Sequence, residues 1–161
     1  NRKHALANYV MGSLRLQEGE YGEAEDFLRR SVEANPSAAA LNDLAEVLRR
    51  IRKFDEAEKH VRAALKLSPE LYVAWETLAV ILFEAGKNLD EAEQAVQKSM
   101  ALYDKDLRIR ITLARIQLKK GEIERARETI RLLKSRQSDL SKSDQEALAK
   151  LADEASSNRV R

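Results

Sequence analysis

The stretch of sequence that decides the fold is residues 75–96, WETLAVILFEAGKNLDEAEQAV. It holds a Leu-Ala pair at Leu78-Ala79, a glycine at Gly86 and a second alanine at Ala92. The same arrangement recurs every 33 to 35 residues, and the small residue of the pair returns at Gly12, Ala45 and Ala114. A period in this range is typical of solenoids that stack one helical hairpin per repeat. The sequence therefore predicts an array of helical hairpins.

Each repeat is expected to hold two amphipathic helices joined by a short turn, because apolar residues recur at helical spacing on both sides of the turn. Gly19, Gly86 and Gly121 end the first helix of their repeats, since glycine adopts the left-handed conformation without steric cost. Arg52 stands at that place in the second repeat: either it adopts the left-handed backbone at a cost of about 1 kcal/mol, or this turn has a different shape. The expected helices are 3–18 and 22–35, 38–51 and 55–67, 71–85 and 90–103, and 106–119 and 122–136.

A final helix is expected at about residues 144–156, after a capping box that begins at Ser143. Its apolar residues form one narrow stripe and its other side is charged, as in a helix that caps a solenoid. The first helix has no such cap. Leu6, Val10 and Leu14 on that helix would face either a preceding repeat or a second copy of the chain.

The composition excludes several classes of site. The chain has no cysteine, which rules out disulfides and thiolate zinc sites. Its two histidines, His4 and His60, lie in different repeats, and there is no HExxH, no GxSxG and no glycine-rich phosphate loop. We therefore expect no enzyme, no catalytic residue, no metal site and no cofactor. No window of 18 consecutive apolar residues occurs, so no membrane-spanning helix is expected, and the compartment stays open.

Four in-phase patterns carry a family resemblance over about residues 5–136. The third repeat reads Trp75-x2-Leu78-Ala79-x2-Leu82 and then Ala92-x3-Val96, and prolines close the first two repeats at Pro36 and Pro69. This resembles the tetratricopeptide repeat family, whose pattern is Trp-x2-Leu-Gly-x2-Tyr, then Ala-x3-Phe, then Pro. The resemblance implies an all-α, right-handed α-solenoid of four repeats, at about residues 5–37, 38–70, 71–105 and 106–136, with a capping helix at about 143–157.

The resemblance also implies a protein–protein interaction module, a scaffold or adaptor within a larger assembly. In this family the first helices of the repeats line a concave groove that holds a peptide or protein partner. Helical periodicity selects the residues of those helices that face outward. The predicted groove residues are Tyr9, Asn42, Glu46, Arg49, Glu76, Thr77, Val80, Phe83, Arg108, Ile111, Thr112, Arg115 and Lys119. Apolar anchors beside arginines are typical of a peptide-binding hot spot, although Val80 and Phe83 could equally pack between neighbouring helices.

One specialised groove is not expected. Members of the family that bind chaperones grip a terminal carboxylate with lysine, asparagine and arginine side chains. The matching places in this sequence are Tyr9, Ser13, Asp43, Val73 and Thr77. None of them supplies a cation, and Asp43 would repel a carboxylate.

Charge is uneven along the array. Residues 70–104 hold two basic and seven acidic side chains, a net charge of −5, whereas residues 105–136 hold eleven basic and four acidic ones, a net charge of +7. Either the basic end attracts an acidic partner, or neighbouring repeats neutralise each other through ion pairs. Two alternatives to the groove follow: self-association through the uncapped first helix, and nucleic-acid binding through the basic fourth repeat. Few stacking aromatics line the groove, which speaks against nucleic acid.

Overall fold

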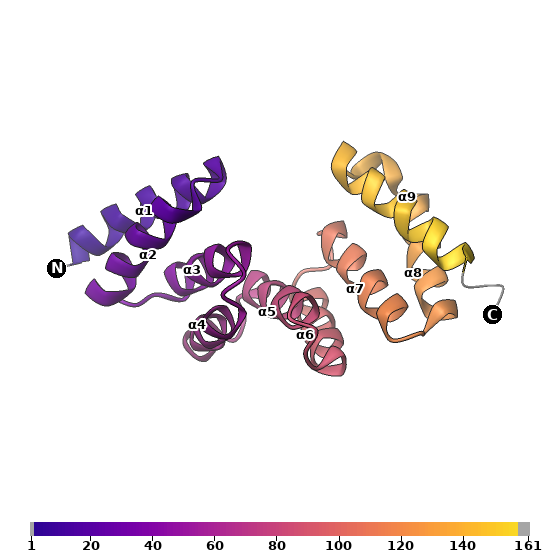
Figure 1. Cartoon of the computed structure of the whole chain (residues 1–161), viewed down its shortest axis with the longest axis horizontal. Helices are drawn as coiled ribbons and strands as arrows, with labels where there is room; N and C mark the ends of the chain where they lie inside the picture. The colour runs from indigo at the N-terminus through magenta and orange to yellow at the C-terminus, as the bar shows by residue number, and fades with distance from the viewer. Residues whose placement is uncertain (1, 158–161) are drawn as a thin grey trace.

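The computed structural model describes residues 2–157, and this part of the chain is helical without any strand. The helices form an elongated arch with α1 at one end and α9 at the other (Figure 1). The elements are α1 (Arg2–Glu18), α2 (Tyr21–Ala34), α3 (Ala38–Arg50), α4 (Phe54–Leu67), α5 (Tyr72–Glu84), α6 (Leu89–Leu102), α7 (Leu107–Lys119), α8 (Ile123–Ser135), a 3₁₀ turn (Gln137–Asp139) and α9 (Lys142–Ser157). The predicted all-α solenoid is confirmed, and each predicted helix matches an observed one to within two residues.

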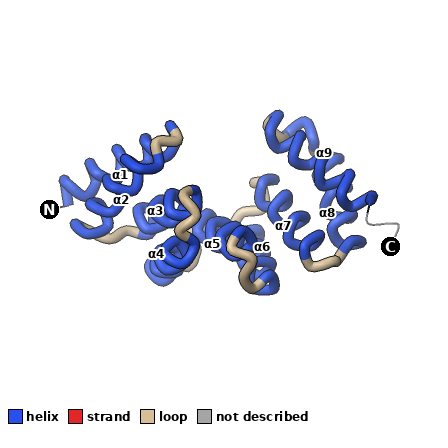
Figure 2. The backbone as a smooth tube through the Cα atoms, viewed as in Figure 1, coloured by secondary structure: helices blue, strands red, loops and turns tan. Residues whose placement is uncertain are grey.

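The arch has two layers. Figure 1 shows α1, α3, α5 and α7 along its inner side, with α2, α4 and α6 behind them on the outer side. Each inner helix packs mainly on the outer helix that follows it, and each hairpin then packs on the next one. The loops that join the helices are short (Figure 2). The repeat boundaries given above stay predictions.

Small residues allow the two helices of each hairpin to approach closely. The positions are buried throughout: Gly12 and Ala24, Ala45 and Ala57, Ala79 and Ala92, and Ala114 and Ala126. At Gly12 there is no room for any side chain, because a Cβ atom there would lie 2.6 Å from Cγ of Leu28 and 3.2 Å from its backbone nitrogen. Leu28 is itself fully buried, so it cannot move aside easily.

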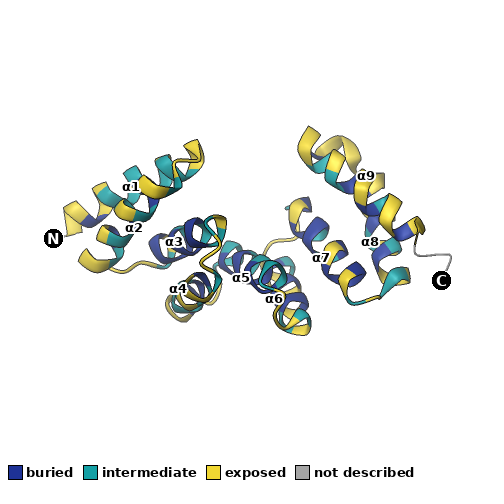
Figure 3. Cartoon of the chain, viewed as in Figure 1, coloured by how far each residue is buried: buried dark blue, intermediate teal, exposed yellow. Residues whose placement is uncertain are grey.

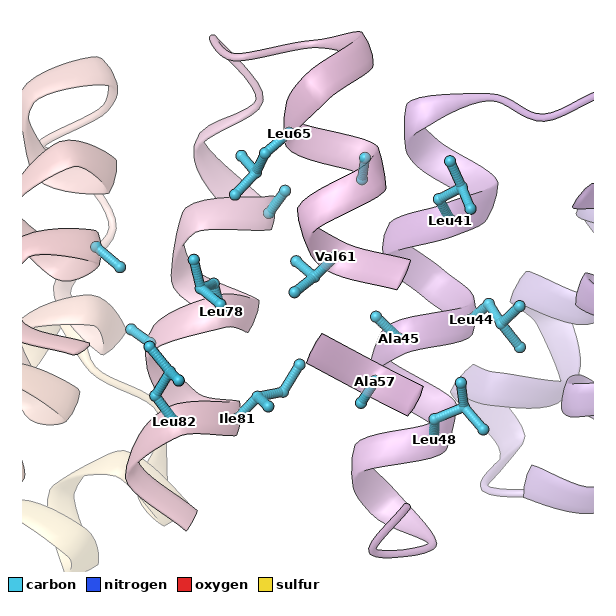
Figure 4. Close-up of a cluster of buried hydrophobic side chains, with 14 of the residues drawn as sticks. Leu41, Leu44, Ala45, Leu48, Ala57, Val61, Leu65, Leu78, Ile81 and Leu82 are labelled. Carbon is cyan, nitrogen blue, oxygen red and sulfur yellow. The ribbon is translucent and has the colours of Figure 1, made fainter. Parts of the chain in front are cut away.

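Two apolar clusters fill the space between the layers. The larger runs from α2 through α6 and reaches Ile109 and Ile116 of α7; Figure 4 shows its centre, where Val61 and Leu78 lie between adjacent helices. The smaller joins α7, α8 and α9, and Ile111 and Leu118 of α7 belong to it. The helix α7 therefore contributes to both clusters.

The turns within hairpins share one backbone conformation. Gly19, Gly86 and Gly121 have φ values of 81°, 65° and 78°, and Arg52 has φ 64°, the single non-glycine residue with positive φ among residues 2–157. The arginine therefore takes the left-handed conformation, one of the two alternatives that the sequence leaves open for this turn. Its guanidinium lies over the Phe54 ring, 5.2 Å from the ring centroid.

Side chains cap several of the helix starts. Asp106 caps α7 by accepting from the Arg108 amide. Asn88, the extra residue of the longest turn, caps α6 in the same way. The capping box predicted at Ser143 is wrong: the helix starts earlier, and Ser141 Oγ accepts from the Asp144 amide at 3.2 Å. Serines at 141 and 143 both satisfy the sequence pattern, and the geometry of the preceding turn selects the first.

We expect Gly12→Ala to destabilise the fold by about 1–3 kcal/mol, because the new methyl group overpacks a site that Leu28 already fills. Gly22→Ala is the matched control: nothing lies within 4 Å of a Cβ at that position, and alanine favours a helix more than glycine does. Urea denaturation of the two variants measures the difference. Equal stability of Gly12→Ala and the parent chain would show that the hairpin tolerates a wider spacing.

We expect Arg52→Gly to stabilise the chain by up to about 1 kcal/mol, since glycine removes the cost of the left-handed backbone. Loss of the contact with Phe54 offsets part of that gain. Thermal unfolding followed by circular dichroism measures the net effect. A clear loss of stability would mean that the aromatic contact outweighs the backbone strain.

Candidate functional site

The predicted groove residues all lie on the inner layer of the arch. Tyr9 is on α1, and the others are on α3, α5 and α7. Their exposure differs widely. Arg108, Arg115 and Lys119 are exposed; the half-buried residues are Tyr9, Glu46, Arg49, Glu76, Val80 and Phe83; and the buried ones are Asn42, Thr77, Ile111 and Thr112.

Five of these residues line one hollow at the α9 end of the array. Its volume is about 350 Å³, and α5 and α7 provide Glu76, Arg108, Ile111, Thr112 and Arg115. The floor is apolar and charged groups of both signs stand around it. A hollow of this kind suits an apolar side chain whose neighbours carry charge.

The rest of this hollow comes from α9, which the sequence predicts only as a cap. Asp144, Ala147, Lys150 and Leu151 complete the lining. The missed signal is the position of α9 in the array: it follows α8 as each inner helix follows the outer helix before it, and it packs on both α7 and α8. A cap that takes the place of an inner helix also extends the inner wall.

Phe83 and Arg115 form a pair across two inner helices. The Arg115 guanidinium lies 4.7 Å from the centroid of the Phe83 ring, within the range of a cation–π contact. The ring also packs against the larger apolar cluster, as the interpretation of Phe83 as a packing residue predicts. Only part of the ring is therefore open to a ligand, and Arg115 covers some of that part.

Arg49 is already engaged by neighbouring carboxylates. It donates to Glu84 of α5 at 2.7 Å and 2.8 Å, and to Glu46 of its own helix at 2.6 Å and 2.8 Å. Burial alone would raise the pKa of Glu46, but the hydrogen bonds from Arg49 and Arg50 outweigh it and hold that pKa below its usual range. The structure therefore uses Arg49 to tie α3 to α5, and a ligand would have to compete for it.

Four of the residues predicted to face outward are buried, so their predicted exposure is wrong, although Ile111 and Thr112 do line the hollow. Asn42 and Thr77 are each 8% exposed, and Thr77 donates to the Val73 carbonyl of its own helix. Ile111 and Thr112, each 7% exposed, reach only the floor of the hollow. The cause is the packing of successive inner helices on one another, which the periodicity of a single helix does not reveal. Tyr9 lines a separate small hollow between α1 and α2.

Two carboxyl groups on the inner face are poorly solvated. Burial raises the pKa of Glu76, and the nearby Asp106 and Glu46 add to the rise, while Arg108 opposes it. Burial also raises the pKa of Asp43, although Ser13 of α1 donates to its carboxylate at 2.6 Å and lowers it in part. A cationic group on a partner would relieve the desolvated charge of Glu76.

Many of the basic side chains of residues 105–136 are paired. Lys120 contacts Asp90, Glu93 and Glu122 at 2.6–2.9 Å, and Arg125 contacts Glu93 at 2.6 Å. The same link occurs earlier in the array, where Lys53 pairs with Glu25 and Lys87 pairs with Glu58. Lys120 and Arg125 are therefore neutralised by carboxylates of the acidic segment, which weakens the case for a nucleic-acid surface.

We expect Glu76→Gln to stabilise the chain by less than about 1 kcal/mol near pH 7.5, because the side chain is partly exposed and its charge is only partly desolvated. The folded pKa of Glu76 lies above that of the unfolded chain, so folding disfavours the ionised form. The gain should vanish below about pH 4, where the glutamate is protonated in both states. Thermal melts across this range measure it.

Glu46→Gln is the matched control with the opposite sign. The pKa of Glu46 is lowered in the folded state, so its ionised form stabilises the fold at neutral pH and that contribution is lost as the pH falls. The variant should therefore melt lower than the parent near neutral pH. If both variants shift in the same direction, the assigned environments of the two carboxylates are wrong.

Comparisons with known proteins agree with this geometry. Three tetratricopeptide repeat family models match residues 5–37, 42–106 and 85–153. No curated protein matches the chain in sequence at a significant level. Among residues 2–157, no helix is long and apolar enough to cross a membrane.

Several solved structures are similar in fold. A tetratricopeptide repeat protein of Thermus thermophilus has a TM-score of 0.79 at 16% identity, over 96% of this chain and 87% of that one. The MamA protein has a TM-score of 0.74 at 16% identity, over 97% of this chain and 92% of that one. The first tetratricopeptide domain of Spaghetti (RPAP3), solved with the HSP90 peptide SRMEEVD, has a TM-score of 0.70 at 22% identity, over 75% of this chain and 96% of that one.

Proposed function

Because the chain belongs to the tetratricopeptide repeat family, we propose that its inner face holds a segment of a partner protein as part of a larger assembly. The family fold and neighbours solved with bound peptides support a protein–protein interaction module. The observation that carries the location is the hollow of about 350 Å³ between α5, α7 and α9. Because a site of this kind is already formed, less conformational entropy is lost when a partner binds.

The chemistry of the hollow favours a segment with an apolar side chain between charged ones. Ile111, Ala147 and Leu151 offer apolar contact. Glu76 would take a lysine or arginine of the partner, since a cation relieves its raised pKa. Arg108, with 64% of its side chain exposed, remains open to a carboxylate even though it also contacts Asp106.

A partner whose terminal carboxylate is held on the inner face, at the end of the groove away from α9, fits this protein poorly. The Spaghetti domain is described with an HSP90 peptide, but here Asp43 lies between Ser13 and Glu46 on the inner face. Burial already disfavours the charge of Asp43, and a second carboxylate beside it would add repulsion. The proposed partner therefore binds by an internal segment.

The test is affinity capture by the chain and by a groove variant that combines Phe83→Ala, Arg108→Glu and Arg115→Glu. We expect a partner protein to be retained by the parent chain and lost by at least tenfold in the variant, because the variant removes one anchor and reverses two charges around the hollow. Circular dichroism must first show that the variant is folded.

The control variant carries Arg131→Glu and Lys134→Glu on α8, which makes the same change in charge on the outer layer. If the control variant retains the partner and the groove variant loses it, the result supports binding on the inner face. If only the control variant loses the partner, the binding site lies on α8 instead. Recovery of nucleic acid in place of protein, with binding that weakens steeply as salt rises, overturns the proposal in favour of the basic fourth repeat.

A further inference from the structure

The helix α1 carries an apolar stripe that nothing in the structure covers. Leu6, Val10 and Leu14 are 63%, 55% and 44% exposed, and their spacing of four residues places them along one side of the helix. Only Ala5 and Gly12 of α1 are buried, so in Figure 3 the helix shows much less dark blue than α3.

One place of this stripe is buried in each of the later inner helices. Counted from the small residue of each repeat, the place of Leu14 is taken by Val47 in α3, Ile81 in α5 and Ile116 in α7. Each of these three side chains is 0% exposed, because a preceding hairpin packs against it. The place of Leu6 is taken by Ala39, Val73 and Arg108, and the place of Val10 by Asp43, Thr77 and Thr112. An apolar residue at all three places is therefore a feature of α1 that the later inner helices do not share, and at the place of Leu14 the element that covers it elsewhere is a helix.

The opposite end of the array does not supply that helix in a second copy. The large apolar residues of α9, Leu148 and Leu151, point into the array and are buried. The residues that α9 leaves exposed are mostly polar or charged, among them Glu146, Lys150 and Asp153. Head-to-tail stacking of α1 on α9 would bury these charges against leucine, which is unfavourable.

The surface that matches the stripe is the stripe itself. If two α1 helices pack antiparallel about a two-fold axis at Val10, then Leu6 of each copy meets Leu14 of the other, and Val10 meets its equivalent. The same arrangement places Arg2 at the exposed start of one helix beside Glu18 at the end of the other. The two α1 surfaces are therefore complementary both in their apolar contacts and in their charges, as a closed two-fold interface requires.

We propose that α1 is an interface with a second copy of the chain, formed by the antiparallel packing of two α1 helices through Leu6, Val10 and Leu14. The interface lies at the end of the array away from α9 (Figure 1), so the resulting dimer leaves the hollow between α5, α7 and α9 open in both copies. It is independent of the partner proposed for that hollow. One helix per copy makes a small interface, and association in the micromolar range is expected.

The first test is sedimentation velocity from about 5 to about 200 μM, the range in which a small interface associates. We expect a concentration-dependent dimer whose dissociation constant rises at least tenfold in Val10→Glu, which places two carboxylates face to face. Leu132→Glu is the control, because Leu132 is as exposed as Leu14 but lies on α8. A strict monomer at the highest concentration, or a dimer that Val10→Glu leaves unchanged, overturns the proposal.

The second test fixes the geometry and uses the absence of cysteine from the chain. Under mild oxidation Val10→Cys should form a disulfide-linked dimer by itself. Leu6→Cys and Leu14→Cys should each crosslink poorly alone but well when mixed with each other. Efficient crosslinking of Leu6→Cys alone would indicate parallel helices and would overturn the antiparallel arrangement, and crosslinking of a Leu132→Cys control to the same extent would show that the Val10→Cys reaction is nonspecific.

Discussion

The close approach of the two helices within each hairpin is the constraint on which the rest of this molecule depends. The small residues at this approach are buried throughout the array, and at Gly12 even a methyl group would overlap Leu28. Because the helices lie this near to each other, the leucines, valines and isoleucines beside them can close the space without large voids. The stacking of hairpins and the curvature of the inner face follow from that spacing.

How much of the structure could be predicted depends on the range of the interaction involved. The ends of the first helices at Gly19, Gly86 and Gly121 depend on a residue next to them in sequence, and these ends were predictable. The burial of Asn42 and Thr77 depends on how one inner helix sits against the next, and a single helix carries no sign of it. The contribution of Lys150 and Leu151 to the hollow needs the docking of α9 onto α7, which is equally remote from local sequence.

Ion pairs link neighbouring repeats of this fold. Lys53, Lys87 and Lys120 each reach back to a glutamate of the preceding outer helix, at 2.6–2.9 Å. The Lys53–Glu25 and Lys87–Glu58 pairs are partly exposed, and each contributes little alone, on the order of 0–1 kcal/mol; Glu93, the partner of Lys120, is buried. The regular placement of these pairs nevertheless gives each of these junctions a preferred alignment.

The sharing of α7 between two apolar clusters has a consequence for how the array comes apart. Ile109 and Ile116 belong to the larger cluster, whereas Ile111 and Leu118 belong to the smaller one with α8 and α9. In a linear array each hairpin is stabilised only by its neighbours, so opening can begin at an end and stop where the contacts change partner. Here that boundary is a single helix, and the α8–α9 segment can detach while α1–α6 keep their amide protons protected from exchange. Such a half-open state would dismantle one wall of the hollow without unfolding the protein, so occupancy of the hollow and closure of this end of the array are thermodynamically linked.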